Sequence, residues 1–134
     1  MTGVQTCALP ISDPDSYSPE LAKYKAGIKQ YESQYATDVT SVSGWAAGKL
    51  FADALTAVGP DPKAIEAWIS KQSHYTFGGL QGPYNYTLGS RPNPCVTQLV
   101  YDNGAFVRGK TAAKPPAFNC GPILNTKTGK PYPN

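Results

Sequence analysis

Apolar side chains recur at helical spacing early in the chain, directly after Ser18-Pro19. The residues that share this spacing, and that form one predicted apolar face, are Leu21, Tyr24, Ile28, Tyr31 and Tyr35. The Ser18 hydroxyl can accept from the free N–H groups at a helix start, and Pro19 suits the first helical position because it has no N–H to lose. The pattern predicts a first helix from Pro19 to Tyr35.

A second helical pattern runs from Ser43 to about Val58. Ser43 is its expected N-cap, and Gly59 is its expected left-handed stop, with Pro60 just beyond. The residues that we expect to be buried on this helix are Ala47, Leu50, Phe51, Ala54, Leu55 and Val58.

A third and shorter pattern follows Asp61-Pro62, which is again a capping residue before a proline. Its apolar face would consist of Ile65, Trp68 and Ile69. We expect this helix to end near Gln72.

Beyond the helices the pattern changes to short β-prone runs separated by turn residues. A short strand is expected over Pro83–Thr87, after a bend made by nearby glycines. Asn103-Gly104 separates the β-rich stretches Cys95–Tyr101 and Ala105–Arg108, and both turn residues tolerate positive φ, so a β-hairpin is expected there. Residues from Gly109 to Asn134 are rich in Pro, Lys, Thr and Gly and predict an irregular tail.

The order of elements, three helices and then a short strand and a hairpin, predicts an α/β fold that is incomplete as a domain. Three helices and one hairpin cannot all bury their apolar faces without more strands. We therefore expect this chain to be part of a larger protein.

The first twelve residues, Met1 to Ser12, show neither a helical nor a strand period. They resemble the in-frame translation of a common sequencing-library adapter. A secretory signal, the alternative, needs a basic start and a longer apolar core, and this stretch contains no Lys or Arg. We expect Met1 to Ser12 to be an unstructured artefact that contributes nothing to the core, and the biological chain to begin near Asp13.

Composition narrows the classes of partner. Charged residues make up 16% of the chain, the net charge is +3, and the basic residues are scattered rather than clustered. Nucleic-acid binding is therefore not expected, because it requires a basic patch. No apolar run approaches the ~18 residues that a membrane-spanning helix needs.

The cysteines suggest an oxidising compartment. Cys95 and Cys120 remain once Cys7 is set aside with the first twelve residues. An even pair in a chain rich in Gly, Pro, Tyr and Asn indicates an exported protein with one disulfide, and the alternative is two unpaired thiols. There is no CxxC and His74 is the only histidine, so the sequence predicts no zinc site.

Catalytic motifs are missing from the sequence: it contains no GxSxG, Walker loop or HExxH. A lone histidine such as His74 is more often a surface or packing residue than a general base. We predict that the protein is not an enzyme, with no catalytic residues, no metal and no cofactor.

Trp45 is the best candidate for contact with a small ligand. It lies in the first turn of the expected second helix, directly after Ser43-Gly44. A helix N-terminus offers free N–H groups and partial positive charge, and an aromatic plate beside such donors suits a small amphipathic molecule. Ser43 and Trp45 are therefore the predicted ligand-binding residues, with packing as the alternative role of Trp45.

Several motifs occur in the order found in one family of receptors. They are Gly44-Trp45-Ala46, Ala57-Val58-Gly59, Gly79-Leu80-Gln81-Gly82-Pro83-Tyr84, Val96-Thr97-Gln98-Leu99-Val100 and Asn103-Gly104-Ala105-Phe106-Val107. In this order they resemble the C-terminal part of type I periplasmic binding proteins, the leucine/isoleucine/valine-binding branch of ABC-transporter solute receptors. The resemblance covers roughly Asp13 to Arg108, about the last third of a full receptor. The Cys95/Cys120 pair and the long Pro-rich end depart from shorter-tailed members.

The resemblance implies a fold of two α/β lobes with the ligand trapped between them. Residues 13–74 would be helices of the first lobe, residues 75–108 the last crossing and a hairpin of the second lobe, and residues 109–134 a tail. The implied parent binds an amino acid, amide or similar small solute in the periplasm or outside the cell and delivers it to membrane permease subunits. A sensory domain of the same fold and a free-standing secreted module with one disulfide are the alternatives.

Overall fold

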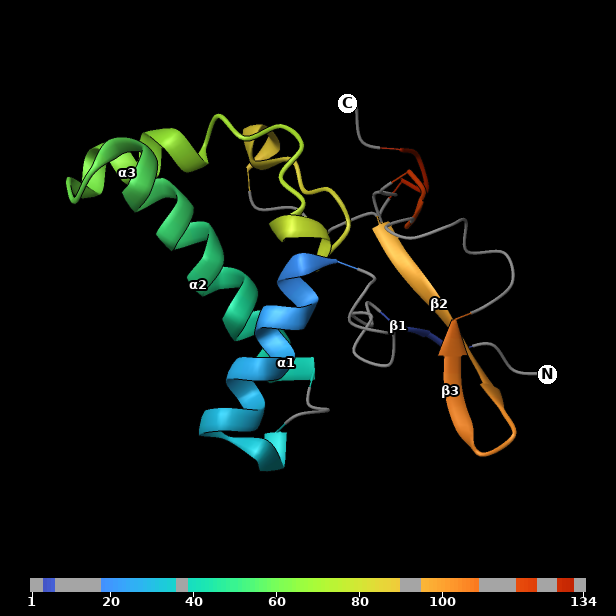
Figure 1. Ribbon diagram of the computed structural model, residues 1–134. Helices are drawn as coiled ribbons and strands as arrows, with labels where there is room; N and C mark the ends of the chain where they lie inside the picture. Colours follow the sequence, from blue (N-terminus) through green and yellow to red (C-terminus); the bar gives the residue numbers. More distant parts are fainter. Residues whose placement is uncertain are drawn as a thin grey trace.

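A computed structural model describes residues 4–6, 18–35, 39–89, 95–108, 118–122 and 128–131 of the 134-residue chain. This part of the chain contains three α-helices and a few short strands, and it is mostly helical. Figure 1 shows the helices on one side of the molecule and the strands β1 to β3 on the other. The structure therefore contains both element types that the sequence predicts, and the three helices precede the hairpin strands β2 and β3 as predicted.

The first helix, α1, spans Pro19–Tyr31. The Ser18 side chain accepts a hydrogen bond from the Leu21 N–H at 3.0 Å, so the predicted cap is confirmed. The predicted C-terminal bound was wrong, because the chain leaves the α-helix at Glu32 and forms a 3₁₀ turn, η2, over Ser33–Tyr35. Tyr31 is 75% exposed and does not belong to the buried face.

The second helix, α2, spans Val39–Val58, so it begins four residues before the predicted N-cap Ser43. The first residues of α2 are Val, Thr and Ser, which have lower helix propensity than Ala or Leu, and propensity alone therefore favours a start at Ser43. Val42, however, is fully buried against α1, and this packing outweighs the propensity of the first turn. Gly59 ends the helix as predicted, with φ +77° and its N–H donating to the Leu55 carbonyl at 2.9 Å.

The buried face of α2 also differs from the prediction. Ala54 is buried and Leu50 is partly buried, as predicted, but four other members of the predicted stripe are exposed: Ala47, Phe51, Leu55 and Val58. The buried side chains on this helix are instead Val42, Ala46 and Ala54. The apolar surface of α2 is wider than one partner can cover, and α1 covers only the side that carries Val42 and Ala46.

The third helix, α3, spans Pro62–Ile69 and folds back beside α2. The Asp61 side chain accepts from the Lys63 N–H at 3.0 Å, which confirms the predicted cap. The apolar face made by Ile65, Trp68 and Ile69 is only half-buried, and no residue of α3 is fully buried. This helix therefore adds little to the enclosed core.

The core lies between α1, α2 and the segment that follows α3. Its buried members are Leu21, Tyr24, Val42, Ala46, Phe77 and Leu80. Phe77 and Leu80 belong to this last segment, where a 3₁₀ turn, η3, spans Phe77–Gly79. The core is small, because burying six side chains leaves much apolar surface on the far sides of α2 and α3.

The segment from Tyr75 to Leu88 does not contain the predicted strand over Pro83–Thr87. Tyr75 and Tyr84 form an isolated antiparallel bridge, and a 3₁₀ turn, η4, spans Tyr86–Leu88. The Asn85 side chain accepts from the Thr87 N–H at 3.0 Å. This local hydrogen bond favours a turn over an extended strand.

The predicted hairpin is confirmed. Strand β2 spans Cys95–Asp102, strand β3 spans Ala105–Arg108, and they pair antiparallel with Asp102 opposite Ala105. Asn103 and Gly104 both have positive φ, which a two-residue turn of this kind requires.

Strand β1, Val4–Thr6, pairs antiparallel with β2, with Thr6 opposite Thr97. The expectation that Met1 to Ser12 is unstructured was therefore wrong for these three residues, and the rest of the segment lies outside the described residues. The physical reason is that without β1 this edge of β2 would be unpaired, and an unpaired strand edge offers N–H and C=O groups to any extended segment of the chain.

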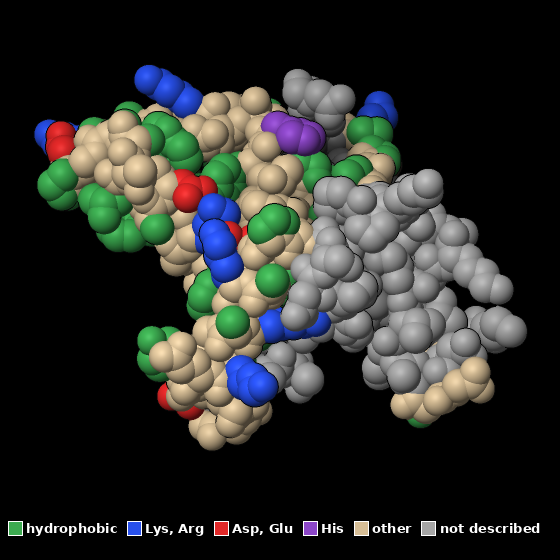
Figure 2. Space-filling view, in the orientation of Figure 1, with side chains coloured by type: hydrophobic (Ala, Val, Ile, Leu, Met, Phe, Trp, Pro, Cys, Tyr) green, Lys and Arg blue, Asp and Glu red, His purple; other side chains and the backbone are tan. Residues whose placement is uncertain are grey.

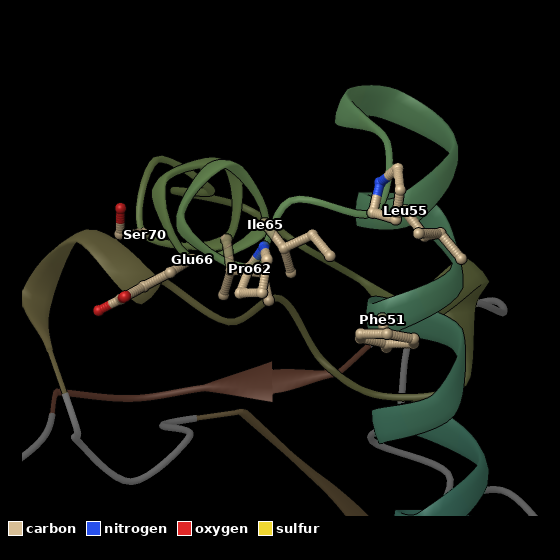
Figure 3. A pocket seen from close by; sticks show the side chains of 8 residues that line it. Phe51, Leu55, Pro62, Ile65, Glu66 and Ser70 are labelled. Carbon is tan, nitrogen blue, oxygen red and sulfur yellow. The ribbon is translucent and has the colours of Figure 1, made fainter.

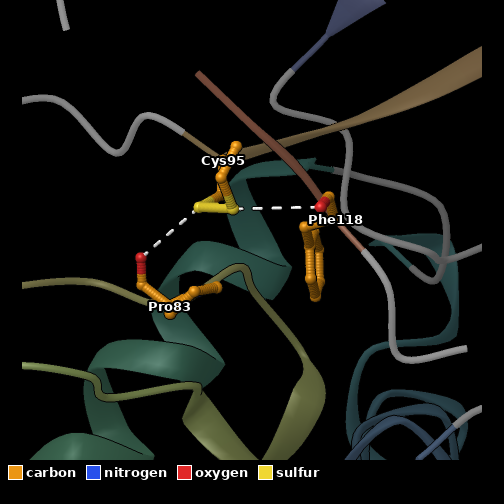
Figure 4. Close-up of a disulfide and its surroundings, with 4 residues drawn as sticks. Pro83, Cys95 and Phe118 are labelled. Atoms are coloured by element: carbon orange, nitrogen blue, oxygen red, sulfur yellow. Dashed lines mark hydrogen bonds between the residues drawn. A yellow bond between two sulfur atoms is a disulfide. The ribbon is translucent and has the colours of Figure 1, made fainter. Parts of the chain in front are cut away.

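The predicted disulfide is present between Cys95 and Cys120, with a Cα–Cα distance of 4.0 Å. It joins β2 to a fourth strand, β4, Asn119–Cys120, which pairs antiparallel with the start of β2. In Figure 4 the two sulfur atoms lie beside the carbonyl oxygens of Pro83 and Phe118, at 3.7 and 3.8 Å. The disulfide thus anchors this part of the tail, as predicted.

Candidate functional site

The two predicted ligand-binding residues, Ser43 and Trp45, both lie on α2 but not in its first turn, because the helix begins at Val39. Residues two apart on a helix point in different directions. Ser43 is exposed, whereas Trp45 is half-buried and faces α1. The structure therefore does not bring these two side chains together, and the expected helix N-terminus beside Trp45 is not there.

Trp45 packs between the two long helices. Its indole N–H donates to Glu20 Oε1 at 2.8 Å, and its ring meets Tyr24 edge-on with 5.8 Å between centroids. A Cβ added to Gly27 would lie 2.7 Å from a Trp45 ring carbon, so the ring fills the space above that glycine. These contacts match the packing role that was the alternative for Trp45.

The most developed polar arrangement, which we call the Glu20–Tyr75 network, joins α1, α2 and the segment after α3. Lys49 Nζ lies 2.9 Å from Asp53 Oδ2 and 3.9 Å from Glu20 Oε2. The Tyr75 hydroxyl donates to Asp53 Oδ2 at 2.5 Å. Lys23 Nζ lies 3.7 Å from Glu20 Oε2, so two carboxylates are balanced by two ammonium groups.

Burial and charge shift the acid–base behaviour of this network. Burial alone raises the pKa of Asp53, but hydrogen bonds from Tyr75 and Lys49 and the charges of Lys49 and Lys23 outweigh it, so the pKa lies below its usual value. Burial, and then the hydrogen bond and charge of Asp53, raise the pKa of Tyr75 well above its usual value. Asp53 is thus held ionised and Tyr75 protonated at neutral pH, which suits a structural pair better than a proton-transfer pair.

Gly78 closes one side of this network. Its φ is +68°, and an added Cβ would lie 2.9 Å from Glu20 Cβ and 3.1 Å from Lys49 Cε. The roles of Glu20, Asp53 and Tyr75 were not predicted from the sequence. Only the Lys49/Asp53 spacing of four residues was visible as a signal, and such pairs are common on solvent-exposed helix faces. Figure 2 shows basic and acidic side chains side by side over α2.

An apolar groove, which we call the α2–α3 groove, lies between two of the described helices. It has a volume of ≈ 480 Å³ and is lined by Phe51, Leu55, Pro60, Pro62, Ile65, Glu66, Ile69 and Ser70. In Figure 3, Phe51 and Leu55 of α2 face Pro62 and Ile65 of α3, whereas Glu66 and Ser70 point away from them. Phe51 is 54% exposed and Leu55 and Val58 are each 39% exposed, so a wide apolar surface is open to solvent.

The described residues contain no group of three His, Cys, Asp or Glu side chains that could hold a metal ion. His74, the one histidine of the chain, is exposed. None of the described helices is both long and apolar enough to cross a membrane.

Comparisons with protein-family models, with curated proteins and with solved structures find no match to this chain. The described residues therefore provide two candidate sites: the Glu20–Tyr75 polar network and the open, apolar α2–α3 groove. The first has its hydrogen-bonding groups occupied by one another, and the second offers a surface rather than reactive groups.

Proposed function

We propose that the chain is the C-terminal part of a solute-binding protein of an ABC importer, and not an enzyme. In this proposal the parent binds an amino acid, amide or similar small solute outside the cytoplasmic membrane and passes it to permease subunits. The support from sequence is the ordered set of motifs from Gly44-Trp45-Ala46 to Asn103-Gly104-Ala105-Phe106-Val107, which resembles the end of type I periplasmic binding proteins.

The observation that carries the proposal is the α2–α3 groove. Stable soluble domains seldom expose Phe and Leu side chains from two helices on one continuous surface unless that surface is covered in the working protein. Here Phe51 and Leu55 are more than a third exposed, while the core cluster among the described residues contains six buried apolar side chains. A parent that adds a sheet against this surface would complete the layer of helices.

The Glu20–Tyr75 network supports the part of the proposal that concerns the crossing between the two lobes. In the resemblance, the segment near Tyr75 to Pro83 crosses between lobes. Here Tyr75 is tied to Asp53 of α2, and Phe77 and Leu80 are buried against α1 and α2. A crossing held this firmly to one group of helices would keep its near end fixed when the lobes close.

The disulfide favours a second candidate, a free-standing secreted module. The Cys95–Cys120 bond joins two strands beyond the helices and suits an oxidising compartment. A module of this kind would not need a parent, and it would be monomeric and soluble with the α2–α3 groove uncovered. A sensory domain would have the same two-lobed fold, and it would differ from the importer only because the parent acts with signalling proteins instead of permease subunits.

The test begins with the intact gene, which supplies the parent sequence upstream of Asp13. The parent and residues 13–134 are then titrated calorimetrically with the same panel of branched amino acids, short amides and urea. We expect micromolar binding of one panel member by the parent and none by residues 13–134, because a small-ligand site normally encloses ~70–90% of its ligand. A parent without a second lobe, or micromolar binding by residues 13–134, would contradict the proposal.

A further inference from the structure

The turn between β2 and β3 carries a peptide unit that can change chemically without an enzyme. Asn103 is followed by Gly104, and both residues are exposed at the tip of the hairpin. We propose that Asn103 is a deamidation site, at which the side-chain amide is lost through a cyclic imide and the main chain of the turn is altered.

The reaction needs only the chain and water. The backbone nitrogen of Gly104 attacks Cγ of Asn103, a new N–C bond closes a five-membered imide, and the side-chain nitrogen leaves as ammonia with the proton that the backbone nitrogen gives up. Water then opens the ring. Addition of water at Cγ leaves aspartate, whereas addition at the main-chain carbonyl leaves Gly104 joined through Cγ, as isoaspartate.

The local structure leaves the attacking nitrogen open. Gly104 has no Cβ to shield its own N–H, and nothing lies within 4 Å of the place where a Cβ would be. Among the described backbone groups, none accepts a hydrogen bond from this N–H, and the strand pairing resumes with Asp102 opposite Ala105. The turn selects Asn-Gly because both residues have positive φ, +48° and +86°, and the same choice creates the reactive pair.

Other asparagines in the same stretch are disfavoured. Asn85 is followed by Tyr86, and its Oδ1 accepts from the Thr87 N–H at 3.0 Å and from the Thr87 hydroxyl at 2.6 Å. Asn93 is followed by Pro94, which has no N–H to attack with. Asn103 should therefore react while these two do not.

The structural consequence depends on which product forms. Aspartate at position 103 keeps the main chain unchanged, and Asp tolerates the left-handed conformation of the turn. Isoaspartate adds one carbon to the main chain, and a two-residue turn has no room for it, so the pairing of Asp102 with Ala105 and of Tyr101 with Phe106 should be lost first. The hairpin thus contains a site of chemical ageing at its tip.

The test uses the full oxidised chain, incubated in mildly alkaline buffer at physiological temperature and then reduced, alkylated and digested with trypsin. One peptide, residues 72–108, carries Asn85, Asn93 and Asn103, because trypsin does not cut between Arg91 and Pro92. We expect aspartate and isoaspartate to accumulate at position 103, with isoaspartate in excess, and to form faster as the pH is raised. Ammonia should be released in equal amount, and Asn85 and Asn93 should stay intact.

Two variants and one condition make the test decisive. G104A keeps the amide but places a methyl group beside the attacking nitrogen, and it should slow conversion several-fold. N103D keeps the turn and should release no ammonia. A sample unfolded in urea gives the rate at which Asn103 converts when the turn is not formed. If Asn103 converts in urea but stays intact in the folded chain, or if Asn85 converts as fast as Asn103, the proposal is overturned.

Discussion

At the scale of single residues, glycines show how closely the helices are fitted. Gly27 of α1 and Gly48 of α2 both lie inside helices, where glycine costs up to about 1 kcal/mol relative to alanine. Around Gly48 there is nothing within 4 Å of an added Cβ, whereas at Gly27 the Trp45 ring lies at 2.7 Å. The same substitution should therefore have opposite effects at the two positions.

We predict that Gly48→Ala raises the melting temperature, because it gains helix propensity at an exposed site. Gly27→Ala should lower it, because the rigid, half-buried indole of Trp45 cannot move without disturbing Tyr24 and Glu20. Thermal unfolding of both variants beside the unaltered chain is the measurement. Equal shifts in the two variants would show that Trp45 does not pack on α1 as described.

The Asp53–Tyr75 hydrogen bond predicts how stability depends on pH. The pKa of Asp53 is lowered in the folded chain, so its contribution is present above the ordinary carboxyl pKa and is lost as the pH falls through the folded value. The pKa of Tyr75 is raised, so its contribution is present below the ordinary phenol pKa and is lost as the pH rises through the folded value.

Asp53→Asn should therefore flatten the acid limb of the stability curve, and Tyr75→Phe should flatten its alkaline limb. Urea unfolding at a series of pH values measures both limbs, and the double variant shows whether the two residues act as one pair. Thr87→Ala, on an exposed turn outside the network, is the control. Limbs unchanged in both single variants would contradict the described hydrogen bond.

At the scale of elements, the sequence correctly predicted those features of helices and turns that depend only on residues close together in the chain. The caps at Ser18 and Asp61, the stop at Gly59 and the Asn103-Gly104 turn depend on neighbours within four residues, and the sequence predicted all of them correctly. The start of α2 at Val39 was not predictable in this way, because it depends on Val42 packing against a different helix.

In the candidate site, too, contacts between segments far apart in the sequence could not be predicted. Trp45 stood out as an unusual aromatic near a predicted helix start, but its partners, Glu20 and Tyr24, lie more than twenty residues away in sequence. The network around Asp53 was missed for the same reason, since Tyr75 reaches it from a segment twenty-two residues further on. Periodicity predicts that α2 has an apolar side, but not which part of that side a neighbour covers.

The disulfide should stabilise the pairing of β2 with β4. Reduction should lower the free energy of unfolding by roughly 3 kcal/mol, as expected for a loop of this size in the chain-entropy account. The 25-residue separation of Cys95 and Cys120 defines that loop. Urea unfolding with and without reductant gives the difference, and Cys7→Ser is the control that removes the third thiol. Three free thiols in the unreduced chain, or two in Cys7→Ser, found by intact mass after alkylation, would contradict the bond.

Gly82 lies directly against this disulfide. An added Cβ would overlap the Cβ of Cys95 and would lie 3.2 Å from the Phe118 ring. We predict that Gly82→Ala slows disulfide formation during refolding and lowers stability, whereas Gly121→Ala, which meets nothing within 4 Å, changes neither. Refolding followed by thiol titration measures the first effect. Unaltered refolding of Gly82→Ala would show that this close approach is absent.

At the scale of the whole molecule, the chain has a small core and a large open apolar surface. Phe51, Leu55 and Val58 are exposed on α2, whereas the described core between the helices has six buried apolar side chains. This imbalance should make the isolated chain associate through the α2–α3 groove. Replacing Phe51 and Leu55 together by Ser should raise the monomer fraction in light scattering, and Ala57→Ser, also exposed on α2, should leave it unchanged. Association equally strong in the Phe51/Leu55 variant would place the contact elsewhere.

The central claim is that the α2–α3 groove is covered in a larger parent, and thiol labelling at Leu55 tests it most directly. Leu55→Cys, in a Cys7→Ser background, is compared in the isolated chain and in the parent, with Ala57→Cys as an exposed control in both. At concentrations low enough to keep the isolated chain monomeric, we predict that Leu55→Cys reacts readily in the isolated chain and is protected many-fold in the parent, while Ala57→Cys reacts equally in the two. Equal reactivity of Leu55→Cys in the parent and in the isolated chain would contradict the account.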